Sequence, residues 1–145
     1  DMLTIQMQNN TFKKEYIGIL DEIVEPKSGT IDAPIARKDG SIIERCISEN
    51  GQKSITHYKV TKIKENMSIL HFILETGRTH QIRVHSKYIG HPIVGDTLYG
   101  NPSSLISRQA LHAYKINFIH PITKKKVEFI ADLPKDMSAL IEKQN

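Results

Sequence analysis

The chain carries the sequence GRTHQIRVH at residues 77–85 and GHPIVGD at residues 90–96. Residues 80–89 contain no glycine or proline, and a glycine follows them directly. We therefore predict a helix over 80–89 that is capped by the Thr79 hydroxyl and ended by Gly90. Glycines and prolines recur over 90–102, which is typical of a loop.

Strands are predicted on both sides of this helix, because hydrophobic and polar residues alternate there. The predicted strands span residues 13–21, 54–64 and 69–75 before the helix, and 110–119 and 126–131 after it. The other predicted segments are a helix end over 2–8, a loop over 26–29, a hairpin arm over 31–52 and a closing helix over 134–143. Strand pairs with helices between them indicate an α+β domain, with a mainly antiparallel or mixed sheet flanked by helices.

The helix predicted over 80–89 has two distinct stripes. Ile82, His85 and Ile89 share the stripe that we expect to be buried, whereas Arg83 and Lys87 lie together on another. A histidine on a buried stripe is more often a satisfied core residue than a ligand, so we assign His85 to the core.

A metal site is not expected. His80 and His85 are five residues apart, which places them about 140° apart around a helix. Cys46 is the one cysteine of the chain, which excludes an intrachain disulfide and a cysteine-based zinc site. A single cysteine also indicates a reducing compartment, the cytoplasm. No run of residues approaches transmembrane length, so we expect no membrane partner.

Positive charge is concentrated in the second half of the chain. The formal net charge of the 145 residues is +4, and with 39% hydrophobic and 25% charged residues the composition is that of a folded protein. Between Thr76 and Val127 the only acid is Asp96, against eight lysines or arginines. A localised basic surface is a footprint of nucleic-acid binding, with RNA as the natural polyanion. The lysine run at 124–126, taken alone, is equally consistent with a solvated basic face.

The stretch over 77–96 closely resembles the arginine-containing motif of the RluA-type pseudouridine synthases, enzymes that isomerise uridine in ribosomal RNA and tRNA. Shorter similarities at 56–60, 111–113, 120–121 and 133–136 extend the resemblance over nearly the whole chain. The resemblance implies a partial pseudouridine-synthase-like catalytic domain that needs no metal and no organic cofactor.

The catalytic aspartate of that family lies in a His-Arg-Leu-Asp motif, and this motif does not occur in the chain. We therefore expect residues 1–145 to be the C-terminal portion of a single catalytic domain whose N-terminal part is missing. Such a fragment is expected to be inactive alone.

Two catalytic residues follow from the resemblance. Arg83 matches the family arginine that pairs with the catalytic aspartate. Tyr16 matches the active-site tyrosine of a Lys-x-Tyr-x-Ala segment, with Gly18 in place of the alanine, and would pack against the target base and assist proton removal from its carbon 5. The carboxylate partner of Arg83 would then lie upstream of Asp1. An unpaired half-buried cation is destabilising, so the fragment is expected to fold poorly or to pair Arg83 with another group.

Asp96 lies in a GDTLYG segment that also matches the family, but this segment does not contain the family's catalytic aspartate. We expect a structural role, with the Asp96 carboxylate bonded to nearby backbone in the loop.

RNA contacts are expected from the start of the helix, where backbone N–H groups bind anions. They are also expected from residues 35–53, which resemble the arm that grips RNA in that family. The candidates are Arg78, Thr79, His80, Gln81 and Lys87 in the first region, and Arg37, Lys38, Arg45 and Lys53 in the second. Taken one at a time, each is also compatible with ordinary surface charge.

The parent protein is thus expected to convert specific uridines of ribosomal RNA or tRNA into pseudouridine, after the nucleotide is flipped into a pocket. The alternative is a non-catalytic RNA-binding module, which would lack an upstream aspartate motif and would form no product. A third possibility is a structural protein with a chance basic loop, for which RNA binding would depend weakly on salt. The sequence carries no sign of the oligomeric state.

Overall fold

The structure, a computed structural model, describes residues 13–142. The helix end predicted over 2–8 lies outside the described residues. Within the described part, no helix is both long and apolar enough to cross a membrane.

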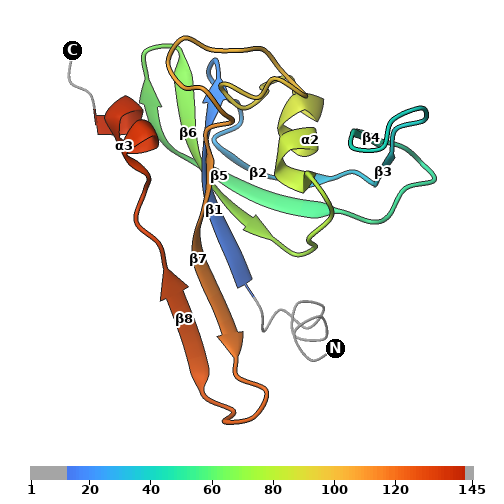
Figure 1. The fold of residues 1–145 in the computed structure, drawn as a ribbon, viewed down its shortest axis with the longest axis vertical. Helices are drawn as coiled ribbons and strands as arrows, with labels where there is room; N and C mark the ends of the chain where they lie inside the picture. The colour runs from blue at the N-terminus through green and yellow to red at the C-terminus, as the bar shows by residue number, and fades with distance from the viewer. Residues whose placement is uncertain (1–12, 143–145) are drawn as a thin grey trace.

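A six-stranded antiparallel sheet forms the centre of the described structure (Figure 1). Its strands are β1 (Lys13–Asp21), β2 (Ser28–Asp32), β5 (Ile55–Lys64), β6 (Met67–Leu74), β7 (Leu111–Ile119) and β8 (Lys126–Ile130). They lie in the order β2-β5-β6-β1-β7-β8, and each neighbouring pair is antiparallel. The predicted α+β class with a mainly antiparallel sheet is confirmed.

The predicted arm is shorter than expected, because its first residues belong to the main sheet. Ser28 begins β2, so the loop predicted over 26–29 is partly wrong, and Ile31 pairs with Thr56 of β5. What projects from the sheet is a small hairpin of β3 (Ile35–Arg37) and β4 (Arg45–Ile47), seen at the right of Figure 1. The five residues of β2 contain a single large apolar side chain, too little for a period-two signal.

Two helices complete the described structure: α2 (Gln81–Tyr88) and α3 (Lys135–Glu142). Ile82 of α2 joins the core formed by β6 residues such as Phe72, as the buried stripe predicted. On α3, Met137 is fully buried, and the carbonyl of Ile141 accepts a hydrogen bond from the ammonium of Lys62 at 2.9 Å.

The predicted cap of α2 is wrong. His80, not Thr79, occupies the N-cap position, and it makes no side-chain cap bond. Its φ of 58° is left-handed, a conformation that is uncommon for a residue with a side chain. The turn is held instead by Gln81, whose amide oxygen accepts hydrogen bonds from the Arg78 N–H at 3.0 Å and the Thr76 hydroxyl at 2.8 Å.

A buried polar bridge joins α2 to the sheet. His85, with no exposed surface, donates from Nε2 to the carbonyl of Ala33 at 2.9 Å, so Nδ1 accepts from the Thr56 hydroxyl at 2.8 Å. The Gln81 amide donates to the same hydroxyl oxygen at 3.0 Å. Burial lowers the pKa of His85, which favours the neutral ring that this bonding requires. The prediction of a satisfied core histidine is confirmed.

Replacing Thr56 by valine should destabilise the fold by about 1–3 kcal/mol, because the buried Nδ1 of His85 loses its donor while the shape is conserved. Urea unfolding measures the loss. The control is Thr30→Val, which removes an exposed hydroxyl bonded to His57 and should cost at most about 0.5 kcal/mol. Equal losses in the two variants would show that the buried bridge contributes no special stability.

Candidate functional site

The centre of the candidate site is an ion pair between Arg83 on α2 and Asp96 in the loop that follows. The Nε and Nη2 atoms of Arg83 donate to the two oxygens of Asp96, each at 2.9 Å. The Asp96 side chain is fully buried and that of Arg83 is 15% exposed. One oxygen of Asp96 also accepts the backbone N–H groups of Leu98 and Tyr99, each at 3.1 Å. The predicted structural role of Asp96 is confirmed.

Burial acts to raise the pKa of Asp96, but it is outweighed. The hydrogen bonds and the positive charge of Arg83, together with the two backbone N–H groups, hold the pKa of Asp96 below its ordinary value. The carboxylate is therefore ionised at neutral pH. The expectation that Arg83 has no carboxylate partner within this chain is wrong, whereas the alternative, that it pairs with another group, is confirmed.

Tyr99 connects this ion pair to the start of α2 and to the β3–β4 hairpin. The guanidinium of Arg83 lies 5.1 Å from the centre of the Tyr99 ring, within cation–π range. The Tyr99 hydroxyl accepts the backbone N–H of Arg45 at 2.9 Å and lies 2.7 Å from Nδ1 of His80. The hydroxyl proton is then available for donation to Nδ1 of a neutral His80 ring. Burial, followed by the charges of Arg83 and Arg45, lowers the pKa of His80 in the same sense.

The two residues expected to be catalytic, Tyr16 and Arg83, line one cavity of about 180 Å³, which we call the Tyr16–Arg83 cavity. Lys14, Arg78 and His80 also line it. Burial raises the pKa of Tyr16, so its hydroxyl keeps its proton at neutral pH and can donate a hydrogen bond. Residues from β1, the turn at 77–80 and α2 thus meet at one place.

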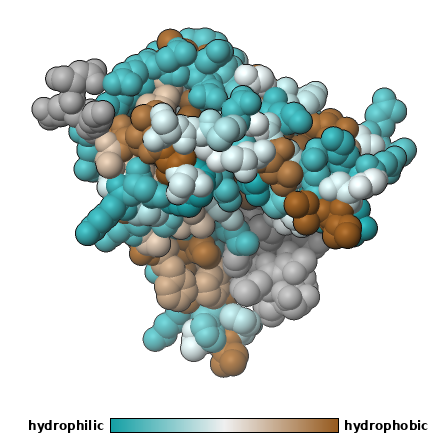
Figure 2. All heavy atoms as spheres, turned by 45° about the horizontal axis from the view of Figure 1, so that its top comes forward, coloured by the Kyte–Doolittle hydropathy of each residue, from teal (hydrophilic) through white to brown (hydrophobic). Residues whose placement is uncertain are grey.

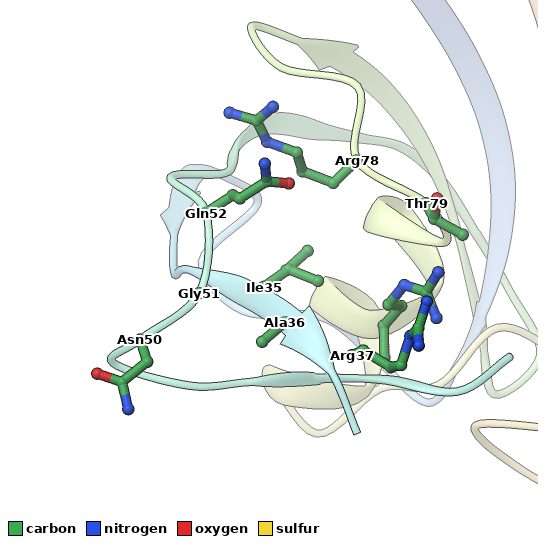
Figure 3. A pocket seen from close by; sticks show the side chains of 9 residues that line it. Ile35, Ala36, Arg37, Asn50, Gly51, Gln52, Arg78 and Thr79 are labelled. Atoms are coloured by element: carbon green, nitrogen blue, oxygen red, sulfur yellow. The ribbon is translucent and has the colours of Figure 1, made fainter. Parts of the chain in front are cut away.

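A second cavity of about 270 Å³, which we call the arginine cleft, lies beside the same turn (Figure 3). It is lined by Arg37, Arg45, Arg78 and Thr79, together with β3 and the loop at 50–52. In Figure 3, β3 passes between Thr79 and that loop, and Arg78 lies at the rim above it. Four of the residues predicted to contact RNA therefore border a single hollow.

A third cavity of about 560 Å³ lies on another side of Arg83 and has an apolar edge. It is lined by Ile42 and Ile43, which are 84% and 61% exposed at the tip of the β3–β4 hairpin, and by Leu98. Figure 2 shows hydrophilic residues over most of the visible face, with apolar residues in small separate groups. Arg83 and His80 line this cavity as well as the Tyr16–Arg83 cavity.

The other residues predicted to contact RNA are placed differently. Gln81 is 3% exposed and its amide group is bonded within the protein at both ends, but it is among the residues that line the Tyr16–Arg83 cavity. Its contact with RNA stays a prediction. Lys38 is paired with Glu44 at 3.0 Å and borders a separate cavity with Lys87. Lys53 is exposed, and its carbonyl accepts a hydrogen bond from Nε of Arg78 at 3.0 Å.

Sequence reasoning missed Lys14, Tyr99 and the exposed pair at 42–43. Lys14 was detectable, because it precedes Tyr16 by two residues on a strand and so shares its face. Tyr99 was present in the GDTLYG segment, but its bonds depend on the fold.

Among residues 13–142, no group of three or more histidine, cysteine, aspartate or glutamate residues is placed to hold a metal ion.

Comparisons with known proteins identify a family and relatives for this chain. The family model described as RNA pseudouridylate synthase matches residues 1–88. An uncharacterized RNA pseudouridine synthase of Bacillus subtilis, YjbO, is 46% identical over 99% of this chain and 51% of its own length. The ribosomal large subunit pseudouridine synthase D of Nitrosomonas europaea is 39% identical over 97% of this chain and 43% of its own length. The chain spans about half the length of these curated relatives.

Solved structures give the same result. The human RNA pseudouridylate synthase domain containing 1 matches with a TM-score of 0.77 and 27% identity, over 90% of this chain and 58% of that one. A second human protein, RNA pseudouridylate synthase domain containing 4, matches with a TM-score of 0.73 over 96% of this chain and 64% of that one. At 20% identity, the second match shows a shared fold alone.

Asp96→Asn should destabilise the protein at pH 7 by about 2–4 kcal/mol, because it leaves the largely buried Arg83 without an ionised partner. The folded-state pKa of Asp96 is lowered, so its contribution is present above the unfolded pKa and is lost as the pH falls through the folded value. The difference between wild type and variant should therefore shrink below about pH 4. Urea unfolding at a series of pH values measures it.

The control is Asp136→Asn, because Asp136 makes the same two-bond contact with Arg108, at 2.9 and 3.0 Å, on the surface. A smaller loss is expected there, since exposed ion pairs contribute little. A loss at Asp96 that is no larger than at Asp136, or that does not change with pH, would contradict the role given to the buried pair.

Proposed function

The chain belongs to the RNA pseudouridylate synthase family, and from this membership and the Tyr16–Arg83 cavity we propose that its parent protein isomerises uridine to pseudouridine in RNA. The observation that carries the proposal is that Tyr16 and Arg83, 67 positions apart, border one cavity beside basic walls. Because the chain spans about half the length of its relatives, we assign residues 1–145 to the C-terminal portion of the catalytic domain and the nucleophilic aspartate to the rest.

Arg83 has the donors to hold that aspartate while remaining bonded to Asp96. Its Nε and Nη2 atoms face Asp96, whereas Nη1 makes no hydrogen bond with the described residues. A guanidinium has five N–H donors in a planar fork, so it can hold two carboxylates along different edges. Asp96 thereby fixes the orientation of Arg83, and the free edge is left for the nucleophile.

The proposed reaction keeps the atoms of uridine and exchanges one bond. The uridine is flipped into the Tyr16–Arg83 cavity, where its face packs on the Tyr16 ring. The aspartate carboxylate attacks carbon 1′ of the sugar, and the bond from that carbon to N1 breaks. The base rotates, and carbon 5 bonds to carbon 1′ while the bond from that carbon to the aspartate breaks. Carbon 5 loses a proton and N1 gains one, so no oxidant, metal or cofactor is required. Tyr16 supports the base and assists the proton removal.

The proposed substrate is ribosomal RNA or tRNA. One relative is named for the large ribosomal subunit, which favours ribosomal RNA. We place the parent protein in the cytoplasm, as the single cysteine of these 145 residues indicates. For the chain by itself, RNA binding without catalysis is the second candidate, favoured by the absence of a His-Arg-Leu-Asp motif and by the basic walls of the arginine cleft.

In the full-length parent, Arg83→Gln should lower kcat for pseudouridine formation by at least about 100-fold, because the nucleophile loses its charged partner. Tyr16→Phe should lower it by roughly 10- to 100-fold, because the ring remains and the hydroxyl is lost. Mass spectrometry of the digested RNA measures the product.

The control is Arg108→Gln, which removes an arginine whose ion pair lies on the surface, and this variant should keep full activity. The 145-residue chain alone should form no product. Product from the chain alone, or an Arg83→Gln parent as active as the control, would refute the proposed roles.

A further inference from the structure

The five arginines of the chain fall into two groups. Arg83 and Arg108 each make a two-bond ion pair with an aspartate. Arg37, Arg45 and Arg78 make no ion pair with any carboxylate of residues 13–142, and all three border the arginine cleft. The residues that line this cleft include no aspartate or glutamate. Three cations without a counter-ion around one hollow indicate an anionic ligand.

The pairing of the β3–β4 hairpin strengthens this conclusion. Arg37 lies directly opposite Arg45 in the register of the two strands, so the two side chains project from the same face. Like charges at such positions repel and destabilise the pair of strands. The next residues along the hairpin, Lys38 and Glu44, are joined by an ion pair at 3.0 Å, whereas the two arginines have no such counter-charge among the described residues. An anion between the two guanidinium groups would turn the repulsion into attraction.

Two of the three arginines are held in place before any ligand arrives. Nη1 of Arg45 donates to the carbonyls of Ile42 and Ile43 at 3.3 and 3.2 Å, and Nε of Arg78 donates to the carbonyl of Lys53 at 3.0 Å. Neutral carbonyls orient these groups without cancelling their charge, and the remaining N–H donors stay available. Orientation in advance reduces the entropy lost on binding.

The far wall of the cleft is close-packed. Residue 52 and Ile35 exchange two backbone hydrogen bonds, at 2.9 and 2.8 Å, which fixes the loop at 50–52 against β3. A Cβ atom at Gly51 would lie 2.6 Å from the carbonyl carbon of Ile35, so only glycine permits this approach. Figure 3 shows this loop facing Thr79 across β3, with the Asn50 side chain directed away from the cleft.

We propose that the arginine cleft binds the sugar–phosphate backbone of the RNA strand whose uridine enters the Tyr16–Arg83 cavity. Arg37 and Arg45 together hold one phosphate, and Arg78, at the other rim, holds a neighbouring phosphate of the same strand. Arg78 also lines the Tyr16–Arg83 cavity, so these phosphates lie beside the flipped nucleotide. Guanidinium groups suit phosphate oxygens because they donate bidentately. This inference rests on the proposed function. Lys38, already paired with Glu44, takes no part.

The test is the binding of a fluorescent single-stranded oligoribonucleotide that contains uridine, in a series where one linkage at a time is a neutral methylphosphonate. Arg37→Gln, Arg45→Gln and Arg78→Gln should each weaken binding of the unmodified strand by roughly tenfold. Arg78→Gln should also lower the slope of log affinity against log salt by about 0.7, the value for one phosphate of a single strand. The double variant Arg37→Gln/Arg45→Gln should lower it by the same amount, because these two arginines share one phosphate. The control, Lys59→Gln, removes a charge from an exposed position that lines none of these cavities and should change neither quantity.

The methylphosphonate series locates the contacts. The Arg37 and Arg45 variants should both become less sensitive to neutralisation of the same linkage, and the Arg78 variant should become insensitive to neutralisation of an adjacent one. The inference would be overturned if the losses in affinity were spread evenly over all linkages, or if Arg37 and Arg45 were coupled to different linkages. It would also be overturned if inorganic phosphate displaced the strand and the affinity did not depend on which linkage is neutral. The proposed function is tested separately, by product formation in the parent protein, so the two proposals can fail independently.

Discussion

The described structure around the site depends on one requirement, that the fully buried Asp96 carboxylate be completely paired. A charge without solvent is tolerated only when hydrogen bonds and an opposite charge replace the water. Arg83 and two backbone N–H groups do so, and in doing so they determine the path of the loop after α2. That path places the Tyr99 ring against Arg83 and its hydroxyl against His80 and the β3–β4 hairpin. One ion pair thus fixes the relative positions of a helix, a loop and a hairpin.

The basic character of the arginine cleft comes from arginines that, unlike Arg83, have no carboxylate partner among the described residues. Arg37, Arg45 and Arg78 face a cleft without a carboxylate, and carbonyl groups orient two of them. The chain therefore uses the same residue type in two ways. A buried arginine with an aspartate stabilises the fold, whereas surface arginines oriented by neutral acceptors retain a charge for a ligand. Net charge alone, at +4, does not distinguish these uses.

Local patterns in the sequence predicted much of the fold. Alternation identified β1, β5, β6, β7 and β8, and the apolar stripe of α2 correctly indicated that Ile82 and His85 are buried. The predictions failed where long-range contacts decide. Thr79 has the chemistry of a cap, but Gln81 reaches Thr76 and Ile55 and leaves His80 at the cap position. The pairing of Arg83 with Asp96 was missed because a lone acid in a basic region shows that a partner is needed without showing which one.

In the proposed reaction, the arrangement around Arg83 would separate two tasks that one carboxylate would perform poorly. A nucleophilic aspartate must be free to bond to the sugar, so it cannot also hold the arginine firmly throughout the reaction. Asp96 is buried, is bonded on both oxygens and has no access to a ligand, and it supplies the constant contact. The guanidinium edge that carries Nη1 thus has a fixed direction before the proposed nucleophile would bind. Because reorientation of a donor during a reaction raises the barrier, a donor fixed in advance stabilises the transition state more than an equally charged mobile donor does.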